Sequence, residues 1–224
     1  MSSAPSSSTP APQLSGRALL AAAIAVNLTA MLLRGPVTCI GPMADAIVKT
    51  FGITYPEYGT LAALPIAAFG IFSFFAAGLG ARLGIKGAVL AALLILFAGA
   101  AARLVTNWNF FLAASLIVGA GIALLNVIMP VAIKNWFGAR TASMMGLYTG
   151  LIGLSGAFGG LTSAPLVQFA ESIKGPLFLW AAAALAAAIV WILLAPSASG
   201  SSSAAAPAKQ AVVRTPFVRL LKSP

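Results

Sequence analysis

One cation lies within an apolar segment of this sequence. Arg34 falls inside residues 18–43, ALLAAAIAVNLTAMLLRGPVTCIGPM, a run long enough to cross a bilayer. A charged side chain at the bilayer centre costs at least ~3 kcal/mol, and such residues usually mark the path of a substrate or ion. Pro36 removes a backbone donor beside this charge, which loosens the helix there. We therefore expect Arg34 to face a cavity and to bind an anionic or electron-rich ligand.

Two other roles for Arg34 remain open. The side chain could extend to the outer membrane surface, or it could pair with Asp45. Asp45 follows eleven residues later, which is ~16 Å along a helix and long for an arginine side chain. Because no acidic residue falls within an apolar segment, the cavity-facing role is favoured.

Three polar residues are weaker candidates for hydrogen bonds to a substrate. Asn27 stands seven residues before Arg34 and Thr38 four residues after it, so helical spacing puts all three on one face. Asn126 lies in a later apolar segment beside Pro130. Helices interrupted in this way line the midplane site of many transporter folds.

Metal and acid–base chemistry lack the residues that they need. The chain contains no histidine, one cysteine and three acidic residues that are far apart in the sequence. These residues predict neither a metal site nor a pair of catalytic carboxylates. We therefore expect no catalytic residues, no cofactor and no enzymatic activity.

The composition is that of a membrane protein. Hydrophobic residues make up 60% of the 224 residues and charged residues only 7%, against about 25% in soluble domains. The net charge of +10 does not indicate nucleic-acid binding, because the cations fall at the ends of apolar segments and in the tails. The lipid bilayer is therefore the expected environment.

Six apolar segments have approximately the length of a transmembrane helix, about 20 residues. They predict an all-α, polytopic fold whose six helices span approximately 18–42, 59–80, 87–105, 110–133, 142–167 and 176–195. Residues 1–16 are expected to form a disordered tail, 17–195 the transmembrane domain and 196–224 a linker.

The basic residues predict the orientation. If the N-terminus is cytoplasmic, nine of the 13 cations lie inside, Lys49, Arg103 and Lys174 lie outside, and Arg34 remains in the membrane. This distribution follows the positive-inside rule. The sequence therefore predicts a multi-pass protein of the inner (plasma) membrane with both termini in the cytoplasm.

The fifth apolar segment is rich in glycine. Small residues three or four positions apart let helix backbones approach closely in lipid, so they predict a helix-packing face. Its members are Gly146, Gly150, Gly153, Gly156, Gly159 and Gly160. A contact that slides as helices rock is the functional alternative to plain packing.

The loop between the second and third segments resembles a family signature. Residues 77–86, AGLGARLGIK, resemble the G-x-L-A-D-R-x-G-R-K motif of the major facilitator superfamily. The resemblance implies that Arg82, Gly84 and Lys86 couple the cytoplasmic helix ends during alternating access. Ala81 stands where the acidic residue should be, which argues against a charge relay at this loop. The arginine that the superfamily carries in its fourth span would fall near Ser115 and is also missing.

Longer stretches resemble the cyanate/2-nitroimidazole transporter family within that superfamily. They are LLRGPVTCIGPMADAI, GTLAALPIAAFGIFSFFAAGLGARLG and GAGIALLNVIMPVAIKNWFGARTASMMGLYTG, and the resemblance covers about residues 17–194. It implies a secondary transporter with twelve spans in two halves, which moves a small anion or polar organic compound.

The resemblance also implies that only the first half is present. Residues 213–224, VRTPFVRLLKSP, resemble the stretch that leads into the seventh span. We therefore expect a truncated or split transporter whose partner is a separately encoded second half, because the substrate site lies between the halves. The alternative is a non-transporting membrane fragment that packs on a partner through the glycines of the fifth segment.

Overall fold

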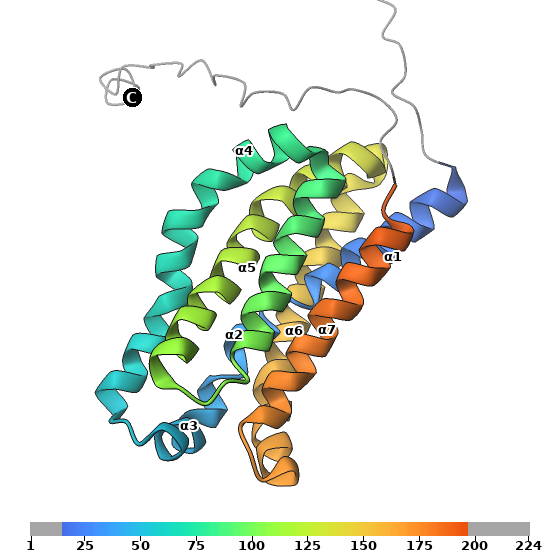
Figure 1. The fold of residues 1–224 in the computed structure, drawn as a ribbon. Coiled ribbons are helices and arrows are strands. Elements are labelled where there is room, and N and C mark those ends of the chain that lie inside the picture. Colours follow the sequence, from blue (N-terminus) through green and yellow to red (C-terminus); the bar gives the residue numbers. More distant parts are fainter. Residues whose placement is uncertain (1–14, 197–224) are drawn as a thin grey trace, which may run out of the picture.

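The computed structural model describes residues 15–196, except for the side chain of Ile66. All of its regular elements are helical (Figure 1): α1 (Gly16–Ala30), α2 (Gly35–Thr38), α3 (Ala44–Phe51), α4 (Tyr55–Ala102), α5 (Trp108–Phe137), α6 (Thr141–Ala170) and α7 (Lys174–Leu194), with short 3-10 helices η1 (Gly41–Met43) and η2 (Gly138–Arg140). The predicted all-α class is confirmed for these residues. Nearly all of the predicted tail and linker falls outside them.

Four apolar helical stretches are long enough to cross a membrane, and they span Gly16–Phe51, Tyr55–Ala102, Trp108–Ala170 and Lys174–Leu194. The second and third contain 48 and 63 residues, more than twice the about 20 that a bilayer requires. Figure 1 shows α4 rising and then descending beside α5, and α6 descending after α5 has risen. Two of the four stretches are thus folded back on themselves.

Gly84 interrupts the helical geometry of α4. Its φ of 66° and ψ of 174° are not helical, and this backbone region is essentially restricted to glycine. The break lies inside the segment that the sequence predicts to be a tight turn, with Arg82 exposed before it. After the break, the carbonyl of Lys86 accepts a hydrogen bond of 3.0 Å from the indole Nε1 of Trp191 on α7. The break at Gly84 thus separates the two limbs of α4, and the Trp191 bond links the second limb to α7.

Replacing Gly84 with alanine is expected to lower the free energy of unfolding by about 1–3 kcal/mol, because a Cβ disfavours this backbone conformation. An added Cβ would meet no atom within 4 Å, so the cost comes from the backbone and not from a clash. Thermal unfolding of the detergent-solubilised protein measures this loss. Gly80→Ala is the matched control, because Gly80 is equally open but helical. Equal losses of stability in Gly84→Ala and Gly80→Ala would contradict the assignment of the loss to the backbone conformation of Gly84.

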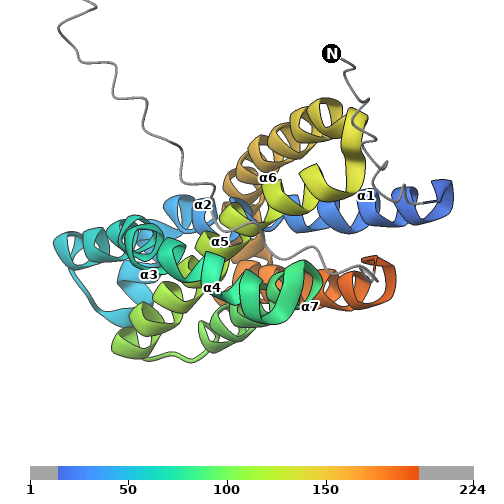
Figure 2. The same ribbon diagram turned by 90° about the horizontal axis from the view of Figure 1, so that it is seen from above.

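The first apolar stretch is broken rather than merely loosened beside Pro36. Helix α1 ends at Ala30, the chain turns through residues 31–34, and α2 begins at Gly35. The turn is held by backbone hydrogen bonds between residues three apart, such as the 3.0 Å bond from the Leu32 N–H to the Thr29 carbonyl. Figure 2 shows that α1 lies between α6 and α7, which also contact it. The break is therefore enclosed by two long helices.

Glycines let the helices approach closely at two places. A Cβ added to Gly99 would lie 2.7 Å from the Val118 N atom, and one added to Gly121 would lie 2.8 Å from the Leu96 N atom, so α4 and α5 touch along their backbones. Gly159 of α6 is equally close to α2, where its added Cβ would lie 2.7 Å from the Gly35 carbonyl oxygen. Close packing thus involves glycines outside the fifth apolar segment as well as within it.

The other glycines of that segment differ in their surroundings. An added Cβ would meet no atom within 4 Å at Gly146, Gly150, Gly153 and Gly160. At Gly156 it would lie 3.2 Å from Cγ of Arg34. Within residues 15–196, only Gly156 and Gly159 of the predicted packing face thus lie against another helix.

Candidate functional site

The helix break presents Arg34 at the surface of the described bundle. Arg34 is the N-cap residue of α2, with a non-helical φ of −127°. Its side chain is exposed and lies along Gly156 of α6. Its guanidinium makes no hydrogen bond or ion pair with the described part of the chain. The alternative pair with Asp45 is not formed within the described residues, and the Asp45 carboxylate instead accepts a 2.8 Å hydrogen bond from the Tyr55 hydroxyl.

Helix α6 satisfies backbone groups that the break leaves without helical partners. The buried Ser155 hydroxyl accepts a 2.9 Å hydrogen bond from the Gly35 N–H and donates to the Met31 carbonyl. The Thr38 hydroxyl donates to the Gly156 carbonyl at 3.0 Å. Irregular backbone at membrane depth persists only where such partners exist. The α6 contacts therefore stabilise the conformation that exposes Arg34.

Among the four sequence-predicted substrate residues, the structure links only Thr38 and Arg34 by a hydrogen bond within residues 15–196. Thr38 lies one turn from Arg34, and its N–H donates to the Arg34 carbonyl at 3.0 Å. Asn27 has an enclosed Oδ1 without a hydrogen-bond partner, and the Asn126 amide donates to its own helix, at the Ile122 carbonyl. The spacing argument for Asn27 assumed a continuous helix, and that premise is wrong because α1 ends at Ala30.

A second arginine is buried where the sequence predicts an outward-facing cation. Arg103 is only 4% exposed at the C-terminal cap of α4. Its Nε donates to the Ser115 hydroxyl at 2.9 Å, and its Nη1 donates to the Pro36 carbonyl at 2.8 Å. Its guanidinium carbon also lies 5.8 Å from the centre of the Phe111 ring. Arg103 is therefore buried against neighbouring helices at the end of α4.

The physical reason is the short α2 helix. A continuing helix would bond the Pro36 carbonyl to the N–H of Ile40, but that N–H donates to Val37 instead. Arg103 supplies the missing donor. The sequence contained one signal for this site, at Ser115. The resemblance to the superfamily places an arginine near Ser115, and in the structure that guanidinium comes from Arg103 at the end of α4. Ser155 carried no comparable signal, because a serine among small residues is unremarkable.

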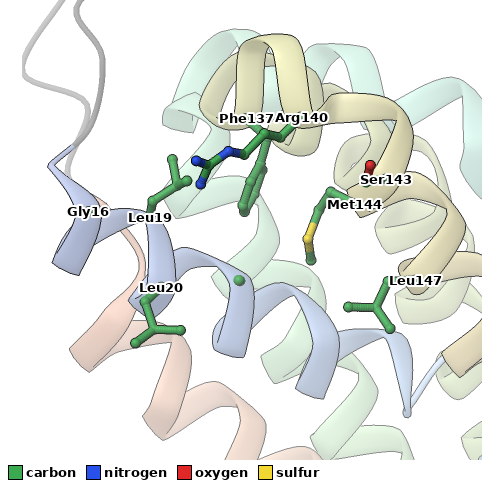
Figure 3. A pocket seen from close by; sticks show the side chains of 9 residues that line it. Gly16, Leu19, Leu20, Phe137, Arg140, Ser143, Met144 and Leu147 are labelled. Carbon is green, nitrogen blue, oxygen red and sulfur yellow. The ribbon is translucent and has the colours of Figure 1, made fainter.

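Two cavities flank the broken stretch. One, of about 270 Å³, is lined by Val37, Thr38, Ile40, Gly41, Tyr58, Leu61, Ala62, Pro65 and Arg103. The other, of about 420 Å³, lies between α1 and the start of α6. Figure 3 shows Arg140 reaching toward Leu19 of α1 across this second cavity, and Met144 also lines the cavity. The second cavity is wide and mostly apolar.

Comparison with known proteins identifies the family of this chain. Residues 22–224 match the Major Facilitator Superfamily. The chain belongs to this superfamily. Membership places it among membrane transporters and not among enzymes.

Three members of the superfamily are similar to this chain. The 2-nitroimidazole transporter of Escherichia coli (strain K12) is 30% identical over 179 residues, which cover 80% of this chain and 46% of the relative. The uncharacterized transporter YycB of Bacillus subtilis (strain 168) is 31% identical over 71% of this chain and 40% of the relative. The cyanate transport protein CynX of Escherichia coli (strain K12) is 28% identical over 73% and 43%. The chain thus spans about half the length of the curated relatives it matches, and the resemblance found in the sequence is confirmed.

Proposed function

We propose that this chain forms one half of a secondary transporter that moves a small anionic or polar solute across the inner membrane by alternating access. The observation that carries the proposal is Arg34, an exposed cation held at a helix break without a partner among the described residues. Such a charge suits a solute that supplies the opposite charge. Superfamily membership and the half-length alignment support the same function.

The proposed topology has six membrane crossings with both termini in the cytoplasm. Two of the four apolar stretches fold back, at Gly84 and at η2, so four stretches can supply six crossings. The orientation rests on the charge count, with nine cations inside and Lys49, Arg103 and Lys174 outside. This distribution follows the positive-inside rule.

The proposed partner is a second six-helix half, which would provide the other wall of the site. Open space beside Gly146, Gly150, Gly153 and Gly160 leaves one face of α6 available for it. The same face supports the second candidate function, a membrane protein that does not transport and that packs on a partner through α6.

In the transporter, Arg82, Gly84 and Lys86 would couple helix movements at the reversal of α4.

The relatives' names suggest the class of solute. Cyanate and 2-nitroimidazole are small and polar, and each has electron-rich atoms that accept hydrogen bonds from a guanidinium. We assign the charge contact to Arg34, and we keep Asn27, Thr38 and Asn126 as weaker hydrogen-bonding candidates. Because the Thr38 hydroxyl already donates to the Gly156 carbonyl, Thr38 would accept a hydrogen bond from the solute or position α2.

Reconstitution into liposomes tests this function. The chain is expressed with and without a second six-helix half encoded downstream, and uptake of radiolabelled cyanate and 2-nitroimidazole is measured. We expect saturable uptake of at least one of them only when both halves are present. An absence of uptake from correctly inserted, assembled halves would favour the non-transporting alternative.

A further inference from the structure

The cavity beside Arg103 is enclosed by the broken stretch and both ends of α4. Val37, Thr38 and Gly41 line it from α2 and η1, and Tyr58 and Pro65 line it from the first limb of α4. At about 270 Å³, it is smaller than the roughly 300–1,000 Å³ typical of sites for drug-sized ligands. Its size therefore suits a small ligand.

Arg103 brings unused hydrogen-bond donors to this cavity. A guanidinium has five N–H donors, and two of them donate to Ser115 and to Pro36. The other three have no acceptor within residues 15–196. Arg103 lines the cavity, and Nη2 is not among the fully enclosed polar atoms that lack a partner.

The positive charge of Arg103 is not balanced by the described chain. Asp45 bonds to the Tyr55 hydroxyl, and Glu57 accepts hydrogen bonds from the Thr54 N–H and hydroxyl. Neither carboxylate forms an ion pair with Arg103. A buried charge is costly unless it is paired. An anion in the cavity would provide both the charge and the acceptors that are missing.

We propose that this cavity binds a small planar monovalent anion, which accepts hydrogen bonds from the free N–H groups of Arg103. A carboxylate matches the guanidinium fork in shape and charge. The cavity shares Thr38 with the candidates for the transport site, but it is lined by Arg103 and not by Arg34. Its test therefore measures binding, with the two arginines substituted separately, and not uptake.

Equilibrium dialysis with radiolabelled formate tests the proposal on the full chain purified in detergent. We expect saturable binding to one site per chain. Arg103→Gln, which loses the charge, is expected to weaken formate binding at least tenfold, and Arg103→Lys, which keeps the charge without the fork, is expected to weaken it less. Circular dichroism and size-exclusion chromatography verify that each variant is folded.

A second pair of variants keeps the proposal falsifiable if the Arg103 variants fail to fold. Ala62→Leu fills the cavity and leaves both hydrogen bonds of Arg103 in place, so it is expected to abolish formate binding. Ala63→Leu is the matched control, because Ala63 is also exposed on α4 but does not line the cavity. Equal binding by these two variants would overturn the proposal. No saturable binding to the folded chain, or binding lost in Arg34→Ala but kept in Arg103→Gln, would overturn it too.

Discussion

Uptake by the assembled transporter is expected to fall roughly 30-fold or more when Arg34 is replaced with alanine, while membrane insertion stays intact. Truncating one member of a hydrogen-bonded charge pair costs 2–5 kcal/mol, and about 1.4 kcal/mol corresponds to a factor of ten. The Arg34 guanidinium makes no hydrogen bond or ion pair with residues 15–196, so truncating the side chain breaks no described polar contact of the bundle. The effect should therefore appear in transport and not in stability.

Two further variants separate the charge of Arg34 from its shape. Arg34→Lys keeps the cation but loses the planar fork, so an intermediate rate of uptake is expected. Arg17→Ala is the control, because Arg17 is an exposed cation in the first turn of α1, far from the break in sequence. Radiolabelled uptake at several solute concentrations measures all three variants. Unchanged uptake kinetics in Arg34→Ala would remove the proposed role in substrate binding.

Features that depend on local chemistry were predictable from the sequence. The apolar segments follow from composition alone, and a loosened helix near Arg34 follows from Pro36, although the structure shows a full break there. The reversal of α4 was placed correctly within residues 77–86, although one residue, Gly84, suffices for it. In each case the chemistry of a few neighbouring residues decides the backbone conformation.

Features that depend on contacts between helices were not predictable in the same way. Arg103 lies near the end of the third apolar segment, 87–105, and a cation in this position is typical of the membrane surface. It is buried because a carbonyl 67 residues earlier, at Pro36, lacks a backbone donor. That deficit exists only once α2 is broken, and the sequence does not show which side chain satisfies it. The Ser155 hydroxyl is paired with the same break across a sequence separation of 120 residues.

The glycine pattern shows the limit of spacing arguments. Spacing alone makes Gly153, Gly156 and Gly160 equivalent members of a packing face. In the described bundle only Gly156 of these three has a neighbouring atom within 4 Å of an added Cβ, and that atom belongs to Arg34. A small residue permits close approach, but the partner helix decides where the approach occurs.

The largest structural effect is expected at Gly35, which is clamped between two helices. A Cβ added there would lie 1.9 Å from Cη2 of Trp180 on α7. On the other side, the Gly35 N–H donates to Ser155 of α6, and Gly159 packs against the Gly35 backbone. Trp180 is only 5% exposed, so its ring has little room to move away. Gly35→Ala is therefore expected to lower the free energy of unfolding by about 3 kcal/mol or more, at the upper end of overpacking effects.

Gly35→Ala is also expected to reduce uptake, although Gly35 is not proposed to touch the solute. Moving α2 away from Trp180 would displace Arg34, because Arg34 is the residue directly before Gly35 and caps this helix. Thermal unfolding and uptake by the same preparation measure the two effects. Gly70→Ala is the matched control, since an added Cβ on Gly70 meets open space on α4. A similar loss in Gly70→Ala would show that the clash is not the cause.

Removing the indole separates the clash from other effects of an alanine at position 35. Trp180→Leu alone is destabilising because it leaves a cavity, but it creates room for the added Cβ. The double variant should therefore be more stable than the sum of the two single losses, by the 0.5–3 kcal/mol that contacting residues show in such cycles. If the losses are additive, Trp180 does not constrain Gly35. A positive coupling, accompanied by partial recovery of uptake, would show that Trp180 and Gly35 together hold Arg34 in its position.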